Sequence, residues 1–357
     1  MSRNLKGRLK YSIFSFLQSI FEFQGRNSSK MSLLIPTQQD YADARGGSER
    51  IPLYHQKIEE LSQERDLESK LKYPWKFESV PGVFKQSDLD TDDLIFNYAE
   101  SDFGITKPWS ELVNQLNELN NQAQDNEIYK LLFLARHGQG NHNVVVERYG
   151  SAEWRRKWHA LENDGDLVYG PDPVLTELGE NQAKENNQAW KEQLSKGAPV
   201  PSRFIVSPLQ RSCNTLLITW NDIFPKGAQP LIVENVREII GFHICNKRST
   251  KTKILERFGK YGYITEPGFE ENDNLYVDDR QETADEQCLR TNGFLQKLFN
   301  EYWDEEHHKS NSVEDQVISI TSHGGTIKTF LSVIGHRAYT IPTGGMIPVV
   351  VKGIRQE

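Results

Sequence analysis

The chain has 357 residues, of which 37% are hydrophobic and 10% aromatic, enough to build a large core in one or two domains. A formal net charge of −8 and a pI near 5.7 argue against a general nucleic-acid binder or a protein held on an anionic membrane, since both need a basic field. The three cysteines are few and far apart, which favours a reducing compartment over a disulfide framework. No segment has the uninterrupted apolar length of a membrane span.

The first thirty residues are basic and carry an apolar patch at 11–23. This composition suits a transit peptide or an amphipathic surface helix. A third interpretation, which we prefer, makes Met31 the physiological start and residues 1–30 dispensable. Residues 31–70 are polar, with a predicted loop at 41–50 and a short exposed helix within 58–72. We therefore expect residues 1–72 to form a polar N-terminal extension.

Apolar and aromatic residues return at Tyr73, so residues 73–125 are predicted to be an arm packed on the main domain, which extends to residue 357. Short β-rich runs then alternate with helical patterns, which predicts an α/β fold with a mostly parallel central sheet. The runs are 129–135, 203–206, 231–233, 317–321 and 347–351, and the helices follow Thr176 or lie within 208–222, 286–303 and 326–335. The long insertion at about 239–281 is predicted to be a lid beside a site.

Charged or titratable side chains follow four of these strands. They are Arg136 and His137, then Arg211, then Arg237 and Glu238, and finally His323 before the glycine-opened helix at Gly324. Because the carboxyl ends of parallel strands meet at one edge, we expect these groups to converge. Arg136, Arg211, the two histidines and a helix N-terminus suit a phosphate dianion, and histidine can act as a nucleophile towards phosphorus. Gly138 allows close backbone approach.

The segments LARHGQGNHN, LTELGENQA, SPLQRSCNT, ENVREIIG and TSHGGTIKT, spread over about 130–355, resemble the histidine phosphatase superfamily, also called phosphoglycerate mutase-like. RHGQGNHN and the upstream VPGVFKQSD look most like its fungal phosphomutase-like branch. The resemblance implies a three-layer sandwich whose central sheet is flanked by helices. It also implies a catalytic domain over residues 73–357.

The resemblance implies a role for each matching residue. His137 is the expected nucleophile, Glu238 the general acid, Arg136, Arg211 and His323 the groups that bind and stabilise the phosphoryl group, and Asn143 and Gly324 further phosphate contacts. This chemistry depends on positioning and electrostatics and requires no metal or other cofactor.

The expected activity is metal-independent hydrolysis of a small phosphorylated metabolite through a phosphohistidine. A phosphomutase, or a non-catalytic phospho-ligand binder, is the alternative. In the glycolytic mutases this loop continues through an acidic residue and a tryptophan, where the chain has Gln139–His142. Neither nucleic acid nor a stable membrane contact is expected, and the expected location is the cytoplasm, with the nucleus as an additional one.

Other residues are weaker candidates for the site. Glu234 and Asp222 are alternative acids outside the motif position, and His142 is a third histidine in the site loop. Cys213 and Cys245 are expected in the core or a pocket wall, and His307 and His308 in solvent. The basic run 246–253 could contact an anionic substrate tail, or form a solvated lid face.

Overall fold

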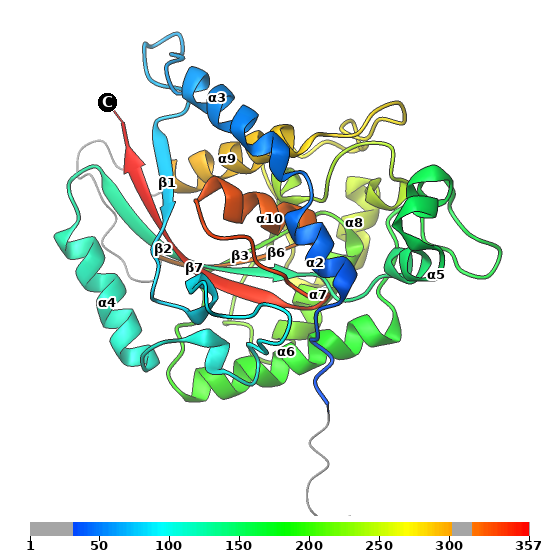
Figure 1. Ribbon diagram of the computed structural model, residues 1–357, viewed down its shortest axis with the longest axis horizontal. Coiled ribbons are helices and arrows are strands. Elements are labelled where there is room, and N and C mark those ends of the chain that lie inside the picture. The colour runs from blue at the N-terminus through cyan, green and yellow to red at the C-terminus, as the bar shows by residue number, and fades with distance from the viewer. Residues whose placement is uncertain (1–30, 302–315, 357) are drawn as a thin grey trace, which may run out of the picture. The chain divides into compact units, whose positions relative to one another are not determined.

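The structure is a computed structural model that describes residues 31–301 and 316–356 (Figure 1). The described residues from Leu33 onward belong to one compact unit, Leu33–Glu357. That unit includes residues 33–72, whose composition suggests a polar extension. The expectations for residues 1–30 and for His307 and His308 lie outside the described residues.

Among the described residues, seven strands form one sheet in the order β1-β7-β2-β6-β3-β4-β5. The strands are β1 (Trp75–Ser79), β2 (Glu127–Arg136), β3 (Arg203–Val206), β4 (Leu231–Ile232), β5 (Ile264–Thr265), β6 (Val317–Ser322) and β7 (Met346–Arg355). Strands β2, β6, β3, β4 and β5 are parallel to one another, and β7 is antiparallel to both β1 and β2. All five predicted strands are confirmed; β1 and β5 were not predicted.

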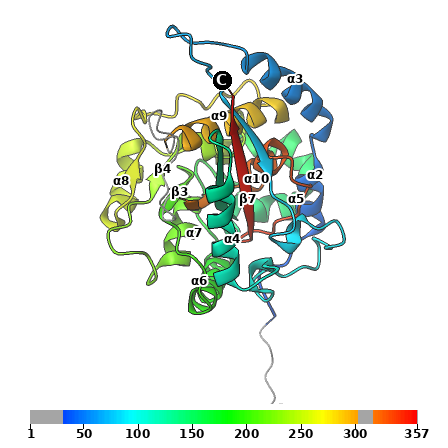
Figure 2. The ribbon, with the colours of Figure 1, turned by 90° about the vertical axis from the view of Figure 1, so that its left-hand side faces the viewer.

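Strand β2 explains the layered architecture. Its side chains alternate between the two faces of the sheet, so Leu131 and Phe133 enter one hydrophobic cluster while Leu132 and Leu134 enter another. A strand buried on both faces needs helices on both sides. Helices α4 (Trp109–Gln122), α6 (Glu177–Ser195), α7 (Gln210–Trp220) and α8 (Lys251–Phe258) contribute to the first cluster, and α3 (Ile51–Leu61), α9 (Ala284–Asn300) and α10 (Gly324–Val333) to the second (Figures 1 and 2). The predicted sandwich is confirmed.

The predicted helices are found with small shifts at their ends. Thr176 caps α6, as its hydroxyl accepts from the N–H of Gly179 at 3.1 Å. Thr283 and Glu286 form a capping box that starts α9 two residues before the predicted helix.

The prediction for residues 41–50 is wrong. Helix α2 (Gln38–Arg45) takes in the first half of the expected loop, started by a capping box between Thr37 and Asp40. The exposed helix expected within 58–72 is also misplaced, since α3 ends at Leu61. Both helices pack on α9 or α10, contacts that a polar sequence does not reveal.

The predicted arm contains β1, which extends the sheet by pairing with β7, and α4, which covers β2. None of the helices in the described part of the chain is both long and apolar enough to cross a lipid bilayer.

Candidate active site

His137 is the first residue after β2 and is 2% exposed. Its backbone N–H donates to the carbonyl of Ser322 at 3.0 Å, which fixes it at the carboxyl end of the parallel strands. Its Nδ1 lies 2.7 Å from the carbonyl of Gly138, so Nδ1 carries the ring proton. The lone pair is therefore on Nε2, where a nucleophile needs it.

Arg211 faces that lone pair from the first turn of α7. Its Nε lies 3.3 Å from His137 Nε2, and the side chain is fully buried. The rest of the guanidinium is fixed by the carbonyl of Cys245 at 2.8 Å and by Asn246 Oδ1 at 3.0 Å. None of these partners is a carboxylate, so the positive charge of Arg211 remains available for an anion at His137.

Arg136 ends β2 and is 8% exposed. One guanidinium nitrogen donates to Asp40 Oδ1 at 2.5 Å and to the carbonyl of Ile341 at 2.6 Å. Its Nε approaches the start of α10, where a Cβ on Gly324 would lie 3.2 Å from it. A glycine at 324 therefore lets the guanidinium lie against the helix N-terminus.

His323 is the N-cap of α10 and is fully buried. Its Nε2 contacts the hydroxyl of Ser207 at 2.7 Å and that of Ser212 at 3.3 Å. The ring centroid lies 5.0 Å from that of His137. The two predicted histidines are thus brought together from β2 and β6, which are neighbours in the sheet.

Asn143 and His142 lie in the first turn of α5 (Asn141–Arg156). Asn143 Oδ1 accepts from the N–H of Gly140 at 2.9 Å, so this oxygen caps the start of the helix. The side-chain amide nitrogen of Asn143 is then the group that can donate to an anion. The ring of His142 lies 5.5 Å from that of His137, so this third histidine belongs to the same cluster.

Glu238 follows the short helical turn after β4 and is half-buried. Its Oε1 accepts from the N–H of Ile239 at 2.9 Å. A Cβ on Gly325 would lie 2.5 Å from the same oxygen, so the carboxylate lies against the first turn of α10. The neighbouring Arg237 pairs with Asp273 at 2.7 Å, and so its charge is directed to a different carboxylate.

Three buried polar atoms of this cluster have no hydrogen-bond partner among the described residues: Arg136 Nε, His142 Nδ1 and His323 Nδ1. Buried polar atoms are almost always paired. Three such atoms around one histidine are therefore the arrangement expected of a site that a polar ligand completes.

Two glycines join the histidine loop to α6. A Cβ on Gly138 would lie 2.3 Å from the carbonyl oxygen of Gly179, and a Cβ on Gly179 would lie 2.1 Å from that of Gln139. Both clashes are with backbone, which cannot rotate away. The close approach explains why both the RHGQG and the TELGE segments carry a glycine at the point where their backbones meet.

We expect Gly138→Ala to lower the free energy of unfolding by about 3 kcal/mol, because the new methyl overlaps fixed backbone. Denaturant unfolding measures this change. Gly293→Ala is the matched control: no atom lies within 4 Å of its added Cβ in the middle of α9, so it should stabilise by about 0.5 to 1 kcal/mol. Equal stability of the two variants would contradict the close contact.

Burial and the nearby arginines lower the pKa of His137 well below 6.5, and the pKa values of His142 and His323 shift the same way for the same reasons. All three rings are therefore neutral near pH 7. Burial, with the charge of His159, also lowers the pKa of the nearby His243 from 6.5 to about 4.

These shifts predict a pH-dependent stability. Below pH 6.5 the histidines of the unfolded chain bind protons that the buried histidines of the folded chain do not. The free energy of unfolding is therefore highest above that pH and falls as the pH decreases. For His243 the loss by pH 4 is on the order of 3 kcal/mol. Urea unfolding at several pH values should show a shallower decline for His243→Gln, which keeps an acceptor for Trp154 Nε1. An unchanged slope would refute the neutral buried imidazole.

The insertion at about 239–281 contacts the site through Cys245 and Asn246, which hold Arg211. Its two ends are joined by a bridge between Gly241 and Gln281, and Arg248 holds the carbonyls of Glu270 and Asn272 at 2.8 and 2.9 Å. From the predicted basic run, Arg248 is buried in a structural ion pair with Glu234 at 2.5 Å, whereas Lys247 and Lys253 are exposed.

The weaker candidates lie in structural positions. Glu234 is paired with Arg248, and Asp222 is exposed and paired with Lys191 at 2.7 Å. Cys213 is buried in the main core, as expected, and burial raises the pKa of its thiol. Burial likewise raises the pKa of Cys245 to about 12, so neither cysteine is a thiolate.

Sequence reasoning missed the supporting residues of the site. Asp40 comes from the N-terminal segment, and its only signal was the T-x-x-D capping pattern at Thr37. Ser207 and Ser212, which hold His323, lie within the SPLQRSCNT segment, where hydroxyls also suit a helix start.

The fold and the clustered histidines and arginines together define an enzyme of the histidine phosphatase type. No protein-family model matches the chain. It is 32% identical over 295 residues to a probable phosphoglycerate mutase of Arthroderma benhamiae, covering 77% of this chain and 84% of that protein. It is 35% identical over 284 residues to phosphomutase-like protein 3 of Candida albicans, covering 77% and 80%.

A third relative is a probable phosphoglycerate mutase of Saccharomyces cerevisiae, 31% identical over 268 residues, covering 69% of this chain and 85% of that protein. The chain therefore belongs to the fungal phosphoglycerate mutase-like family of the histidine phosphatase superfamily. Among solved structures, a mycobacterial glucosyl-3-phosphoglycerate phosphatase aligns at 16% identity and a TM-score of 0.33, over 58% of this chain and 81% of that chain. The family assignment rests on the three fungal relatives.

Proposed function

We propose that the chain hydrolyses phosphomonoesters of small metabolites through a phosphohistidine on His137. The observation that carries this proposal is the state of the His137 ring. Its Nδ1 proton is held by the Gly138 carbonyl and its Nε2 lone pair faces Arg211, in a pocket whose buried polar atoms lack partners. A neutral imidazole held in this way is ready to attack phosphorus.

In the first step, Nε2 of His137 forms a bond to phosphorus as the ester P–O bond breaks. The protonated carboxyl of Glu238 gives its proton to the leaving oxygen. In the second step, water attacks the phosphohistidine, the Glu238 carboxylate accepts a proton from that water, and the N–P bond breaks to release inorganic phosphate. The acid role proposed for Glu238 is supported by its position against Gly325, two residues after His323.

Charge stabilisation in this proposal comes from the protein. Arg211 supplies a positive charge that no carboxylate balances, while Arg136, paired with Asp40, offers its unpaired Nε. His323, the amide of Asn143 and the N–H of Gly324 at the start of α10 supply further donors. Phosphoryl transfer depends on such preorganised charge, so we propose that no metal ion takes part.

A phosphomutase is the second candidate, favoured by the names of the fungal relatives. It would share the first step and return the phosphoryl group to another hydroxyl of the substrate. The loop Gln139–His142 lacks the acid and tryptophan that the glycolytic mutases have there, which favours hydrolysis.

The test is phosphate release from an aryl phosphate and a panel of sugar, nucleotide and glycerate phosphates, with a metal chelator present. We expect release from one class of these esters. Conversion of a glycerate phosphate to its isomer without phosphate release would instead establish the mutase.

A further inference from the structure

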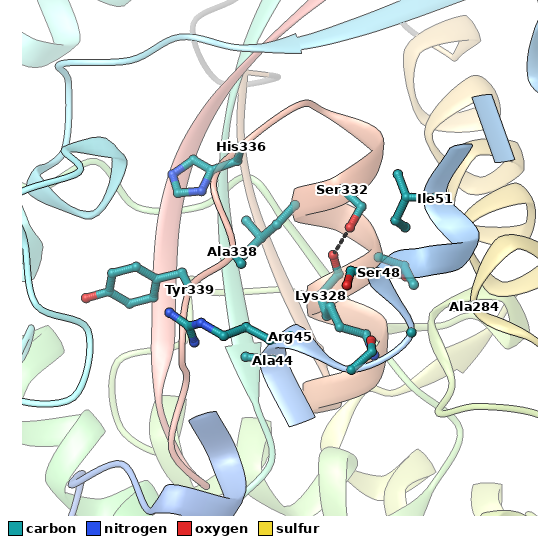
Figure 3. Close-up of a pocket in the computed structure, with 14 residues that line it drawn as sticks. Ala44, Arg45, Ser48, Ile51, Ala284, Lys328, Ser332, His336, Ala338 and Tyr339 are labelled. Atoms are coloured by element: carbon teal, nitrogen blue, oxygen red, sulfur yellow. Dashed lines mark hydrogen bonds between the residues drawn. The ribbon is translucent and has the colours of Figure 1, made fainter. Parts of the chain in front are cut away.

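A second cavity lies away from the catalytic histidines. It has a volume of about 290 Å³ and lies between the segment that joins α2 to α3 and the face of α10 with the loop that follows it. Figure 3 shows side chains of these segments facing one another, among them Arg45, Ser48, Lys328 and Ser332. None of the proposed catalytic residues lines it.

The size and lining of this cavity suit a small amphipathic molecule. A cavity of about 150 Å³ is enough to hold a benzene ring, so this one has room for a ring or short alkyl chain and a polar head. Ala44, Ile51, Leu331 and Tyr339 supply apolar surface. The hydroxyls of Ser48 and Ser332 lie on the same walls as the cationic groups.

The charge of the lining favours an anionic head. No aspartate or glutamate is among the lining residues. Asp93 neutralises Arg45 at 3.0 Å, and burial lowers the pKa of His336, leaving it neutral near pH 7. Lys328 Nζ donates to the carbonyl of Gly46 at 2.8 Å and forms no ion pair among the residues that the structure describes. Asp43 of α2 accepts from Gln39 at 2.7 Å and interacts with the charge of Lys328 without forming an ion pair with it.

The cavity is connected to the catalytic pocket through Arg136. Helix α2, which forms one wall with Ala44 and Arg45, carries Asp40, whose carboxylate accepts from Arg136 at 2.5 Å. The loop of the opposite wall, with Tyr339, continues to Ile341, whose carbonyl accepts from the same guanidinium nitrogen at 2.6 Å. Neither Asp40 nor Ile341 lines the cavity, but both belong to segments that also form its walls, so both bonds that position Arg136 come from those segments.

We propose that this cavity binds a small organic carboxylate with an apolar body, with its head at Lys328, and that the bound molecule holds α2 against α10 and so fixes Arg136 for phosphate. The coupling to phosphate binding rests on the proposed function, whereas the binding of the carboxylate in the cavity does not depend on it.

The test is isothermal titration calorimetry of the full chain with benzoate and hexanoate, and with the corresponding neutral amides. We expect dissociation constants on the order of 1 mM for the carboxylates. The amides, and the variant Lys328→Met, should each bind about tenfold more weakly. Lys184→Met, at an exposed lysine of α6, should bind like the wild type. Ser332→Leu, which fills the cavity from α10, should abolish binding.

Coupling is measured as the affinity for inorganic phosphate with and without benzoate, a readout that does not depend on turnover. We expect benzoate to tighten phosphate binding about fivefold in the wild type and to leave it unchanged in Ser332→Leu. Benzoate that merely competes in the catalytic pocket would weaken phosphate binding equally in both. That result, or equal binding of carboxylates by wild type and Ser332→Leu, would overturn the proposal.

Discussion

His137→Ala is expected to reduce turnover of every substrate by at least about four orders of magnitude, because it removes the only protein atom that we propose forms a bond to phosphorus. The variant should still bind inorganic phosphate, since Arg136, Arg211 and His323 remain. Steady-state phosphate release and a phosphate-binding titration measure the two effects separately.

His55→Ala, at an exposed histidine of α3, is the matched control and should retain full activity. A His137→Ala enzyme that keeps more than about one hundredth of wild-type turnover would show that another group attacks phosphorus. His142, whose ring lies 5.5 Å from that of His137, would then be the first alternative.

Glu238→Gln is expected to separate substrates by their leaving groups. An alkoxide leaving group needs a proton, so kcat/KM for alkyl phosphates, which reports the first step, should fall about 10²- to 10⁴-fold. A nitrophenolate leaves without help, so its ester should lose no more than about tenfold. The kcat/KM values of the two ester classes give the comparison.

Asp222→Asn tests the alternative acid and should change neither substrate class, since Asp222 is exposed and paired with Lys191. An equal fall in kcat/KM for alkyl and aryl phosphates in Glu238→Gln would rule out the acid role of Glu238.

The sheet and its catalytic edge could be predicted because their signals are local. The continuous apolar run of β2 requires burial on both faces, and Arg136 and His137 follow it directly. Parallel strands place their carboxyl ends at one edge of the sheet. The prediction of parallel strands was therefore enough to predict that Arg211 and His323 lie near His137. The structure places all three in one buried cluster.

The supporting contacts could not be predicted, because they join distant parts of the chain. Asp40 lies 96 residues before Arg136, in a segment whose polar composition suggested an extension. The partner of Arg237 illustrates the same point. Glu238 is its neighbour in sequence, but Asp273, 36 residues away, is its partner in space.

The central claim is that the phosphoryl group is carried on His137. An acid quench would destroy phosphohistidine, which is labile in acid. The most direct measurement is therefore an alkaline quench of enzyme mixed with a radiolabelled phosphate ester, followed by peptide mapping at high pH. We expect acid-labile, base-stable label on the peptide that contains His137, and none in His137→Ala. Label on another residue, or turnover with inversion at a chiral phosphoryl group, would contradict it.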